Sequence, residues 1–329
     1  MSELDYLLSP PAARGGAEKI YKATVAGKTN FVLNPDKLQW TTDFVLETIR
    51  QNYPTLEIPF HSRWGHFRPG GIDRSKWLDE KIAHHDPMER ARTKLDLVIT
   101  SVLLDAGSGP TWKYEEKQTG QTITRSEGLG VASFHMFMEG AMSSDKSLKA
   151  DYKGLTSLNV DKLVAGFQVS ASNPLVGVEG RVKLLNNLGA VLKNGTICPG
   201  GRPGGILDYL VARYGKTIPA TALLRAVLDG LGPIWPGRLT HLGTNLGDVW
   251  LHSTLGMIPF HKLSQWMTYS LIEPIEEAGI KVSGVEGLTG LAEYRNGGLI
   301  LDSGLIGLKD IADIHRVWTP DSDVIIEWR

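Results

Sequence analysis

Apolar side chains recur along most of the chain at steps of three and four residues, which is the spacing of one buried helix face. The clearest run begins at Asp86, a good N-cap, and Pro87, whose missing N–H is tolerated at the first helical position. Apolar residues then follow at this spacing as far as Ala106, and Gly107 is a natural stop. The pattern predicts one long, core-facing helix.

The same periodicity predicts further helices, two of which have special features. Residues 125–142 are apolar on most sides, so we expect this helix to be buried, and Thr124 with Glu127 has the spacing of a capping box. Pro274 lies inside the last predicted helix, where we expect a kink or a break. The other predicted helices cover residues 36–52, 176–192, 204–214, 219–231 and 259–278.

Strand signals are sparse. Residues 112–114 and 122–124 flank a polar turn, and we expect one β-hairpin there. Residues 324–327 fit either a strand or the start of a helix, and no alternation of strands with helices is visible. The predicted fold class is therefore mainly α, with one small hairpin near 112–124. We expect one large domain, which could comprise two lobes that meet around 110–125.

Composition excludes several classes of protein. Lys and Arg number 35 against 36 Asp and Glu, so the chain lacks the basic excess that nucleic-acid binding requires. The single cysteine, Cys198, excludes an intramolecular disulfide and a CxxC zinc site, and we interpret it as a packing residue. Neither a secretory signal nor an apolar run long enough for a membrane span is visible. We expect a cytoplasmic protein without a metal or other cofactor, and without nucleic-acid or membrane partners.

One loop between two predicted helices is rich in large polar and aromatic side chains. Arginine offers forked donors to phosphate or carboxylate, and tryptophan offers a stacking face, so the loop could line a site for an anionic, planar ligand. The alternative is a packed loop whose arginines cap helix ends. Two histidines five residues apart, without a defined carboxylate partner, do not indicate a metal site. The side chains concerned are His61, Arg63, Trp64, His66 and Arg74.

Other candidates lie in the second half of the chain. The glycine-rich residues 196–205 precede a predicted helix and could bind phosphate, but the P-loop ending is missing and an ordinary turn is favoured. Asp248 lies close to a tryptophan, and Glu293 lies beside Tyr294 and Arg295. Carboxylates near aromatic rings can act as acids or bases. A helix N-cap would explain Asp248 without any chemistry, and a surface ion pair with Arg295 would explain Glu293.

Several long phrases of the sequence resemble one family, the uracil catabolism protein four family of pyrimidine degradation. The resemblance runs from about Tyr6 to Arg329 and implies a role in a pathway that breaks uracil down through its nucleotide and a ribosylurea intermediate. The phrases are NYPTLEIPFHSRWGHFRPGGIDR (52–74), RSEGLGVASFHMF (125–137), NPLVGVEGRVKLL (173–185), FHKLSQWMTYSLIEPIEEAGI (260–280) and LTGLAEYRNGGLILDSG (288–304).

A more distant resemblance bears on mechanism. Queuosine salvage proteins hydrolyse the N-glycosidic bond of queuosine 5′-phosphate, and their all-α fold is similar to that of helix–hairpin–helix DNA glycosylases. Their phrase ending in Ala-Asp-Tyr-Arg is similar to LTGLAEYR (288–295) here. This resemblance implies a glycosylase-like fold and gives Glu293 the place of their catalytic aspartate, with one methylene more. Asp248 remains the rival.

Together the resemblances imply hydrolysis of a ribosyl N-glycosidic bond, in a ribosylurea-type compound with or without a 5′-phosphate, with release of urea. A carboxylate, Glu293 first and Asp248 second, would stabilise the positive charge that develops on the ribose. Other residues are predicted to bind the substrate. His61, His66 or His261 could assist the leaving group, and Arg63 and Gln265 could bind the ureido group. Arg74, Lys262 and Arg295 could bind a phosphate. Trp64, Phe134 and Trp250 could exclude water, and Tyr294 is a further predicted substrate-binding residue.

Two other functions are compatible with the sequence. One is a non-enzymatic binding protein for a nucleotide or intermediate of the same pathway, and the other is a nucleic-acid base glycosylase, which the charge disfavours. The chain could form a homo-oligomer. Related chains continue past the phrase VIIEWR (324–329) into a further helix, so we expect this one to lack the last core helix and to expose apolar surface near Ile325 and Trp328.

Overall fold

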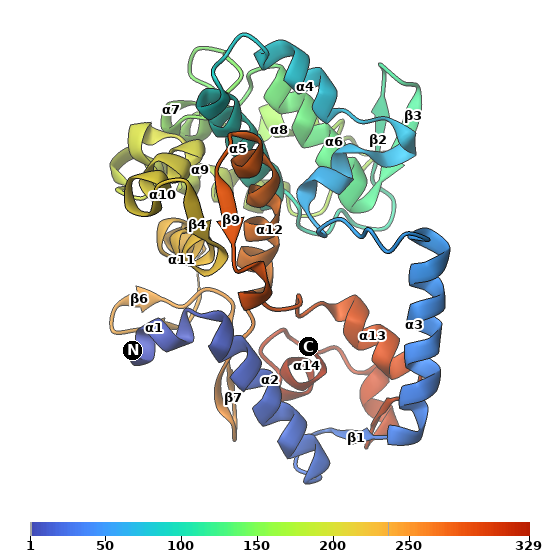
Figure 1. Ribbon diagram of the computed structural model, residues 1–329. Coiled ribbons are helices and arrows are strands. Elements are labelled where there is room, and N and C mark those ends of the chain that lie inside the picture. Colours follow the sequence, from blue (N-terminus) through green and yellow to red (C-terminus); the bar gives the residue numbers. More distant parts are fainter. Residues whose placement is uncertain (1, 236) are drawn as a thin grey trace. The chain divides into compact units, whose positions relative to one another are not determined.

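The computed structural model describes residues 2–235 and 237–329 (Figure 1). Its contacts divide the chain into two compact units, each built from segments that are far apart in sequence. Residues 110–125 lie inside the second unit. The first unit contains the described residues up to Phe60, Arg238–Gln265 and Glu286–Arg329, and the second contains His61–Gly237 and Trp266–Val285.

The first unit combines short helices with antiparallel strand pairs. Phe31 of β1 lies opposite Leu308 of β10, and Val249 of β7 lies opposite Pro259 of β8. A small apolar core forms around Ile20, Ile258, Phe260 and Ile326. The elements are α1 (Glu3–Leu7), α2 (Pro10–Val25), β1 (Phe31–Leu33), α3 (Leu38–Asn52), β5 (Thr240–His241), β6 (Thr244–Asn245), β7 (Val249–His252), β8 (Gly256–Pro259), α13 (Tyr294–Asp302), β10 (Ile306–Leu308) and α14 (Asp323–Trp328).

Helix α3 forms where the periodicity predicts a helix, but four of its large apolar side chains are exposed to solvent. Thr41 is its one buried residue, while Leu38 is 56% exposed and Phe44 is 49% exposed. Trp40 and Phe44 stack on each other along this face, with ring centroids 5.6 Å apart. An apolar stripe therefore identified the helix correctly without identifying a core-facing surface.

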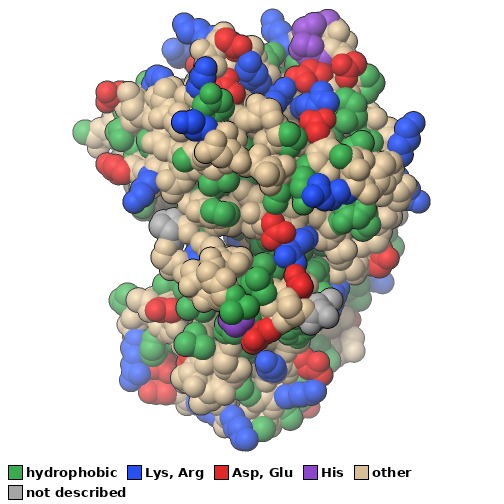
Figure 2. Space-filling view, turned by 90° about the vertical axis from the view of Figure 1, so that its left-hand side faces the viewer, with side chains coloured by type: hydrophobic (Ala, Val, Ile, Leu, Met, Phe, Trp, Pro, Cys, Tyr) green, Lys and Arg blue, Asp and Glu red, His purple; other side chains and the backbone are tan. Residues whose placement is uncertain are grey.

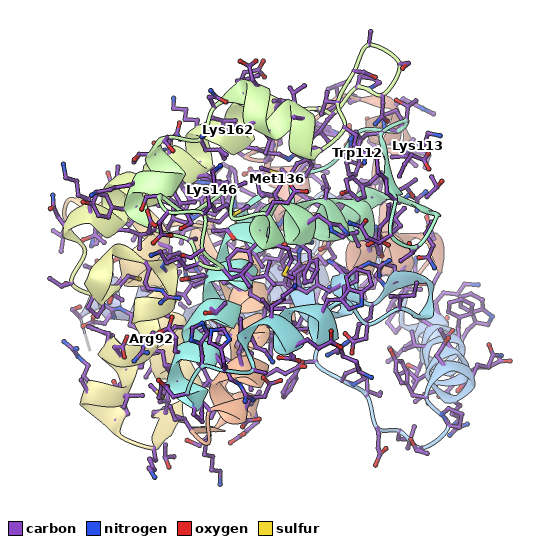
Figure 3. The ribbon with its side chains drawn as sticks, turned by 90° about the horizontal axis from the view of Figure 1, so that it is seen from above. Arg92, Trp112, Lys113, Met136, Lys146 and Lys162 are labelled. Carbon is purple, nitrogen blue, oxygen red and sulfur yellow. The ribbon has the colours of Figure 1, made fainter. Side chains whose placement is uncertain are left out.

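The second unit is built around two buried helices. In α5 (Pro87–Leu103), Asp86 caps the first turn as predicted, because its side chain accepts a hydrogen bond from the Glu89 amide; the helix ends three residues earlier than expected. Helix α6 (Arg125–Met138) is buried from Gly128 to Phe137. Thr124 makes no side-chain cap hydrogen bond, so the expected capping box is wrong. Figure 3 shows Met136 pointing from α6 toward the helix that carries Lys162, α8 (Val160–Gly166).

The remaining elements of this unit complete the helical layer and add two strand pairs. The hairpin predicted near 112–124 is confirmed, with Lys113 opposite Thr124. Thr217 pairs in parallel with Lys281, a pairing that the sequence did not reveal. The elements are α4 (Ser75–Ile82), β2 (Lys113–Glu116), β3 (Gln121–Thr124), α7 (Tyr152–Thr156), α9 (Val178–Asn194), α10 (Ile206–Tyr214), β4 (Thr217–Pro219), α11 (Ala220–Leu231) and β9 (Lys281–Ser283).

Helix α12 (Lys262–Glu277) continues through Pro274, so of the two expected outcomes, a kink or a break, the break does not occur. Its first residues, up to Gln265, belong to the first unit, and the rest belongs to the second. The segment at 324–327 is helical, as part of α14. The prediction of a mainly α fold with a hairpin at 112–124 is thus confirmed, but the expectation of one hairpin alone is wrong, because β5–β6 and β7–β8 are also antiparallel hairpins.

The glycine-rich loop at 196–205 surrounds a carboxylate of the chain itself. The Gly204 amide donates to Oδ1 of Asp96 at 2.6 Å, and Arg202 donates to Oδ2 of Asp96 from Nε (2.9 Å) and Nη2 (2.7 Å). A Cβ atom at Gly204 would lie 2.3 Å from the carbonyl oxygen of Arg92. The loop is therefore explained by close packing on α5 and by an internal anion.

Candidate functional site

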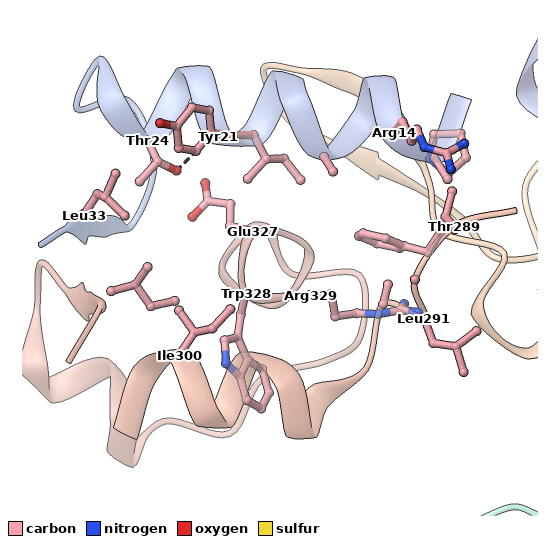
Figure 4. Close-up of a pocket in the computed structure, with 18 residues that line it drawn as sticks. Arg14, Tyr21, Thr24, Leu33, Thr289, Leu291, Ile300, Glu327, Trp328 and Arg329 are labelled. Atoms are coloured by element: carbon pink, nitrogen blue, oxygen red, sulfur yellow. Dashed lines mark hydrogen bonds between the residues drawn. The ribbon is translucent and has the colours of Figure 1, made fainter. Parts of the chain in front are cut away.

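A pocket of about 520 Å³ lies within the first unit, among α2, α13 and α14 (Figure 4). This volume is in the range of small-molecule sites. Figure 4 shows Tyr21 and Thr24 at one end of the pocket and Arg14 and Thr289 at the other. Most of the lining is apolar, and it includes Ile20, Leu33, Phe260, Leu291, Ala292, Ile300 and Ile306.

Two lining residues each carry a buried hydrogen-bond donor that has no partner in the described part of the chain. Neither Nε1 of Trp328 nor Nε of Arg329 has a partner among the described residues. A buried donor without a partner costs about 1–3 kcal/mol, and a ligand with oxygen acceptors would recover part of that cost. The pocket therefore combines apolar walls with a few unsatisfied polar atoms, which is the usual character of a ligand site.

The guanidinium group of Arg329 is fixed by a two-point ion pair with Asp248. Nη1 lies 3.2 Å from Oδ1 and Nη2 lies 2.9 Å from Oδ2. The guanidinium carbon also lies 4.2 Å from the centre of the Phe260 ring and 5.5 Å from that of Tyr294. These contacts hold a positive charge against two aromatic faces, where cation–π attraction adds to the ion pair.

Asp248 uses its carboxylate entirely within the protein. Besides Arg329, Oδ1 accepts from Nε1 of Trp250 at 2.7 Å, and Oδ2 accepts from the Lys262 amide at 3.0 Å. Burial raises the pKa of Asp248, but the charge of Arg329 and these hydrogen bonds outweigh burial and hold the pKa below its usual value. An ionised carboxylate accepts about four hydrogen bonds, so Asp248 has no acceptor left for water or substrate and acts as a positioning residue.

Glu293 is the more accessible carboxylate. It is the N-cap residue of α13, its side chain is 29% exposed, and it forms an ion pair with Nζ of Lys262. Burial raises its pKa, but the Lys262 ammonium and the amides at the start of α13 lower the pKa below its usual value. Glu293 is thus an ionised side chain that directly follows the pocket-lining residue Ala292.

Lys262 connects the two carboxylates. Its backbone N–H donates to Asp248, and its ammonium group pairs with Glu293. One residue at the start of α12 therefore contacts both acids, through its backbone on one side and its ammonium group on the other. Its side chain is 31% exposed, so it remains accessible to a ligand.

Two predicted substrate-binding residues of the first unit are buried and serve to position the chain. Nε2 of His261 lies 2.7 Å from the carbonyl oxygen of Leu7, so this nitrogen carries the proton and donates it. Gln265 is fully buried; its Oε1 accepts from the Thr289 amide at 2.8 Å and its Nε2 donates to Oγ1 of Thr289 at 2.5 Å. Gln265 therefore fixes one end of the pocket-lining segment.

The remaining predicted residues of the first unit are more open. Trp250 is partly buried against the small core, and the guanidinium carbon of Arg238 lies 5.2 Å from its ring centre. Tyr294 is 39% exposed, and Arg295 is exposed at the first turn of α13. Both are accessible next to Glu293.

In the second unit, three predicted residues are buried in the packed interior. Arg74 forms a two-point ion pair with Glu116, with Nε–Oε1 at 2.7 Å and Nη2–Oε2 at 2.5 Å, and its Nη1 donates to three backbone carbonyls. Trp64 is 1% exposed and donates its indole N–H to the carbonyl of Ser270. Phe134 is fully buried. Protein groups already surround these side chains, so we do not carry them into the candidate site.

The other three predicted residues of this unit gather around Trp266, which the sequence analysis missed. The ring centres of His61 and His66 lie 5.9 Å and 5.5 Å from that of Trp266. The guanidinium carbon of Arg63 lies 5.8 Å from the Trp266 ring centre. Trp266 gave no signal because a tryptophan in an apolar helix is most simply interpreted as a core residue.

Surface charge and potential metal ligands do not indicate a further site in the described part of the chain. Figure 2 shows acidic and basic side chains interspersed on the face that it presents. Among residues 2–235 and 237–329, no group of three or more His, Cys, Asp or Glu side chains is placed to hold a metal ion. In the same part of the chain, no helix is long and apolar enough to cross a membrane.

Comparison with known proteins supports the family resemblance. A family model described as "Protein of unknown function (DUF1688)" matches residues 6–329. The chain is 40% identical over 337 residues to "Protein urg3" of Schizosaccharomyces pombe, with 98% of this chain and 82% of the relative covered. It is 38% identical over 343 residues to "Uracil catabolism protein 4" of Lachancea kluyveri, with 91% and 78% covered.

The chain belongs to the uracil catabolism protein 4 family. In this family member, the structure brings together Asp248, Lys262 and Glu293 of the predicted set. Sequence reasoning missed Arg329, whose carboxylate partner is distant along the chain. It also missed the lining segment Thr289–Ala292, although the phrase LTGLAEYR contains it.

Proposed function

We propose that this chain acts in uracil catabolism by hydrolysing the ribosyl N-glycosidic bond of a ribosylurea-type compound. The name of one relative, "Uracil catabolism protein 4", supports the pathway. The observation that carries the reaction is the carboxylate of Glu293, which is ionised and partly accessible and directly follows Ala292, a lining residue of a pocket large enough for a nucleoside-sized ligand.

The reaction follows from the charge that this carboxylate carries. As the C1′–N bond breaks, its electron pair passes to the ureido nitrogen and positive charge builds on C1′ and the ring oxygen. A carboxylate that stays ionised at neutral pH stabilises this charge. Water then bonds to C1′ and loses a proton, while the ureido nitrogen gains one, so that urea and ribose are released. The ammonium group of Lys262 lies against Glu293 and is our candidate for the acid that donates a proton to the ureido nitrogen.

Several side chains near Glu293 in the chain or in the pocket could bind the substrate. Arg295 is an exposed cation that could bind a 5′-phosphate, which leaves Lys262 to act at Glu293. The spare indole N–H of Trp328 and the spare Nε–H of Arg329 could donate to ribose or ureido oxygens. The mainly α fold agrees in class with the queuosine salvage proteins, and a glycosylase-like arrangement remains part of this proposal.

Matched isosteric variants test the mechanism. The chain is incubated with ribosylurea and, separately, with its 5′-phosphate, and released urea is quantified by mass spectrometry. Glu293→Gln removes the charge and retains the shape, and we expect a loss of at least a hundredfold in kcat with little change in the melting temperature. Glu18→Gln is the control, because this glutamate lies on an exposed face of α2, paired with Lys22.

Two results would contradict the proposal. One is urea release by Glu293→Gln at the parental rate. The other is a parental protein whose melting temperature rises with ribosylurea while no urea appears over many hours, because that behaviour belongs to a binding protein of the same pathway. Salt-dependent binding of a DNA duplex with release of a base would instead indicate the glycosylase alternative.

A further inference from the structure

The second unit contains an arginine that is fully buried and incompletely paired. Arg63 lies in the 3₁₀ segment Arg63–Phe67 and has no exposed surface. Its Nε donates to Oγ of Ser101 at 2.7 Å, and its Nη1 donates to the carbonyl of Ser126 at 3.3 Å and lies 3.0 Å from Nδ1 of His66. Nη2 has no partner in the described part of the chain. Arginine only donates hydrogen bonds, so Nδ1 of His66 accepts, and one pair of guanidinium protons is left over.

A second unsatisfied donor lies beside it. Trp266 is 4% exposed, and its Nε1 also lacks a partner within residues 2–235 and 237–329. The guanidinium carbon of Arg63 is 5.8 Å from the Trp266 ring centre, so the two side chains that carry these donors belong to one cluster. His66 is partly exposed and His61 is exposed, and both rings pack against Trp266. The cluster thus combines two buried donors with two imidazole rings, one exposed and one partly exposed.

The charges around Arg63 select the kind of ligand. Nη1 of Arg63 lies 3.3 Å from Oδ2 of Asp105. Burial lowers the pKa of Arg63, and the negative charges of Asp105 and Glu127 partly offset that shift. The guanidinium charge is therefore already balanced by facing carboxylates. An anion placed here would be repelled by both acids, whereas a neutral carbonyl oxygen would accept hydrogen bonds without adding charge.

We propose that Arg63 and Trp266 form a second ligand site, within the second unit, for a neutral, planar compound that carries a carbonyl oxygen, of the ureide or pyrimidinedione class. The carbonyl oxygen accepts from Nη2 of Arg63 and Nε1 of Trp266, and the planar group packs against the imidazole rings of His61 and His66. This site does not depend on the hydrolysis proposed for Glu293, because none of its groups belongs to the first unit.

The indole N–H resonance of Trp266 reports on this site directly. The chain contains nine tryptophans, and a ¹H–¹⁵N spectrum of the full chain resolves their indole signals. Trp266→Phe keeps a ring, removes the donor and identifies its signal; Trp266→Tyr serves the same purpose if the first variant does not fold. Uracil is the probe, since it is planar and neutral and has no ribosyl bond to hydrolyse. We expect a saturable shift of the Trp266 signal, and affinity for uracil about two- to tenfold weaker in Trp266→Phe, as for the loss of one hydrogen bond.

The controls separate this site from the active site and from simple hydration. Glu293→Gln protein should show the same shift with uracil, which distinguishes failure here from failure of the proposed hydrolysis. Trp40→Phe, on the exposed helix α3, should bind uracil as the parental chain does. A Trp266 signal that stays in place at saturating uracil would overturn the proposal and leave the donors to water. So would a signal that moves with inorganic phosphate and not with uracil.

Discussion

Asp248 accepts hydrogen bonds from both terminal nitrogens of Arg329, at 3.2 and 2.9 Å, and so links the start of β7 to the end of α14. The same carboxylate holds the backbone of Lys262, whose ammonium group pairs with Glu293. The two acids singled out from the sequence therefore differ in their surroundings. The carboxylate of Asp248 is fully hydrogen-bonded within the protein, whereas the side chain of Glu293 stays partly exposed.

Asp248→Asn should consequently damage stability more than chemistry. The variant leaves the buried Arg329 without its charged partner, and losses of this kind amount to about 3–5 kcal/mol in the free energy of unfolding. Urea denaturation measures the change, and the exposed Asp321→Asn serves as the control. The folded fraction should still release urea from ribosylurea, unlike Glu293→Gln. A stability change below about 1 kcal/mol would show that the ion pair is dispensable.

The buried ion pair of Arg74 and Glu116 should make the free energy of unfolding depend on pH. Burial raises the pKa of Glu116, but hydrogen bonds from Arg74, Thr119 and His135 outweigh burial and lower the pKa to about 2. A carboxyl with a depressed pKa in the folded state contributes stability above its unfolded pKa and loses it as pH falls through the folded value. This contribution should be complete above pH about 4.5 and should disappear toward pH about 2.

Glu116→Gln tests that dependence through unfolding free energies measured between pH 2 and pH 6. The variant should lie about 3–5 kcal/mol below the parental protein at pH 6, and the two curves should converge in acid. The neighbouring Glu115→Gln, on the exposed face of the same strand, should leave the curve nearly unchanged because solvent screens its charge. Parallel curves for Glu116→Gln and the parental chain would exclude this origin of acid sensitivity.

Gly204 should tolerate no side chain. A Cβ atom there would lie 2.3 Å from the carbonyl oxygen of Arg92, so Gly204→Ala should lower the melting temperature by several degrees or prevent folding. Gly180→Ala is the matched control, since a Cβ at that helical position meets nothing within 4 Å and should stabilise α9 slightly. Equal melting temperatures for the two variants would contradict the packing explanation of the glycine-rich loop.

Cys198 should be chemically silent in the native protein. It is 3% exposed, and burial, together with the charge of Asp96, raises the pKa of its thiol to about 12. Because the thiolate is the reactive form, iodoacetamide at pH 8 should label the native chain far more slowly than the chain in concentrated urea. Mass spectrometry over a time course measures both rates. Native labelling as fast as that of the unfolded chain would mean that this residue is open to solvent.

Local signals in the sequence predicted local structure well. The Asp86–Pro87 start of α5 and the turn between β2 and β3 depend on residues that are neighbours along the chain. Context overrode two other local signals. Thr124 has capping-box spacing but makes no cap bond, and Pro274 is accommodated inside α12. Neither outcome could be read from spacing alone, because each depends on tertiary packing.

The candidate site was predictable only in part, for a related reason. Glu293 and Lys262 stood in recognisable phrases, whereas the partner of Asp248 is Arg329, at the far end of a different segment. Likewise, Arg63 was visible as a loop arginine, but its complete burial beside Trp266 depends on a helix about two hundred residues away in the chain. Sequence patterns identify chemical groups, and long-range contacts decide which groups share a site.

The unit that carries Glu293 has its first strand, β1, paired with its last, β10, from near opposite ends of the chain. Loop closure over such a separation is entropically costly, so this pairing should form late in folding. During synthesis, the first sixty residues must wait until nearly the whole chain has left the ribosome, while the continuous run from His61 to Gly237 can begin to fold. The exposed aromatic residues of α3 would then be open to chaperones or to aggregation throughout that interval. Catalytic competence would accordingly be the last property that this chain acquires.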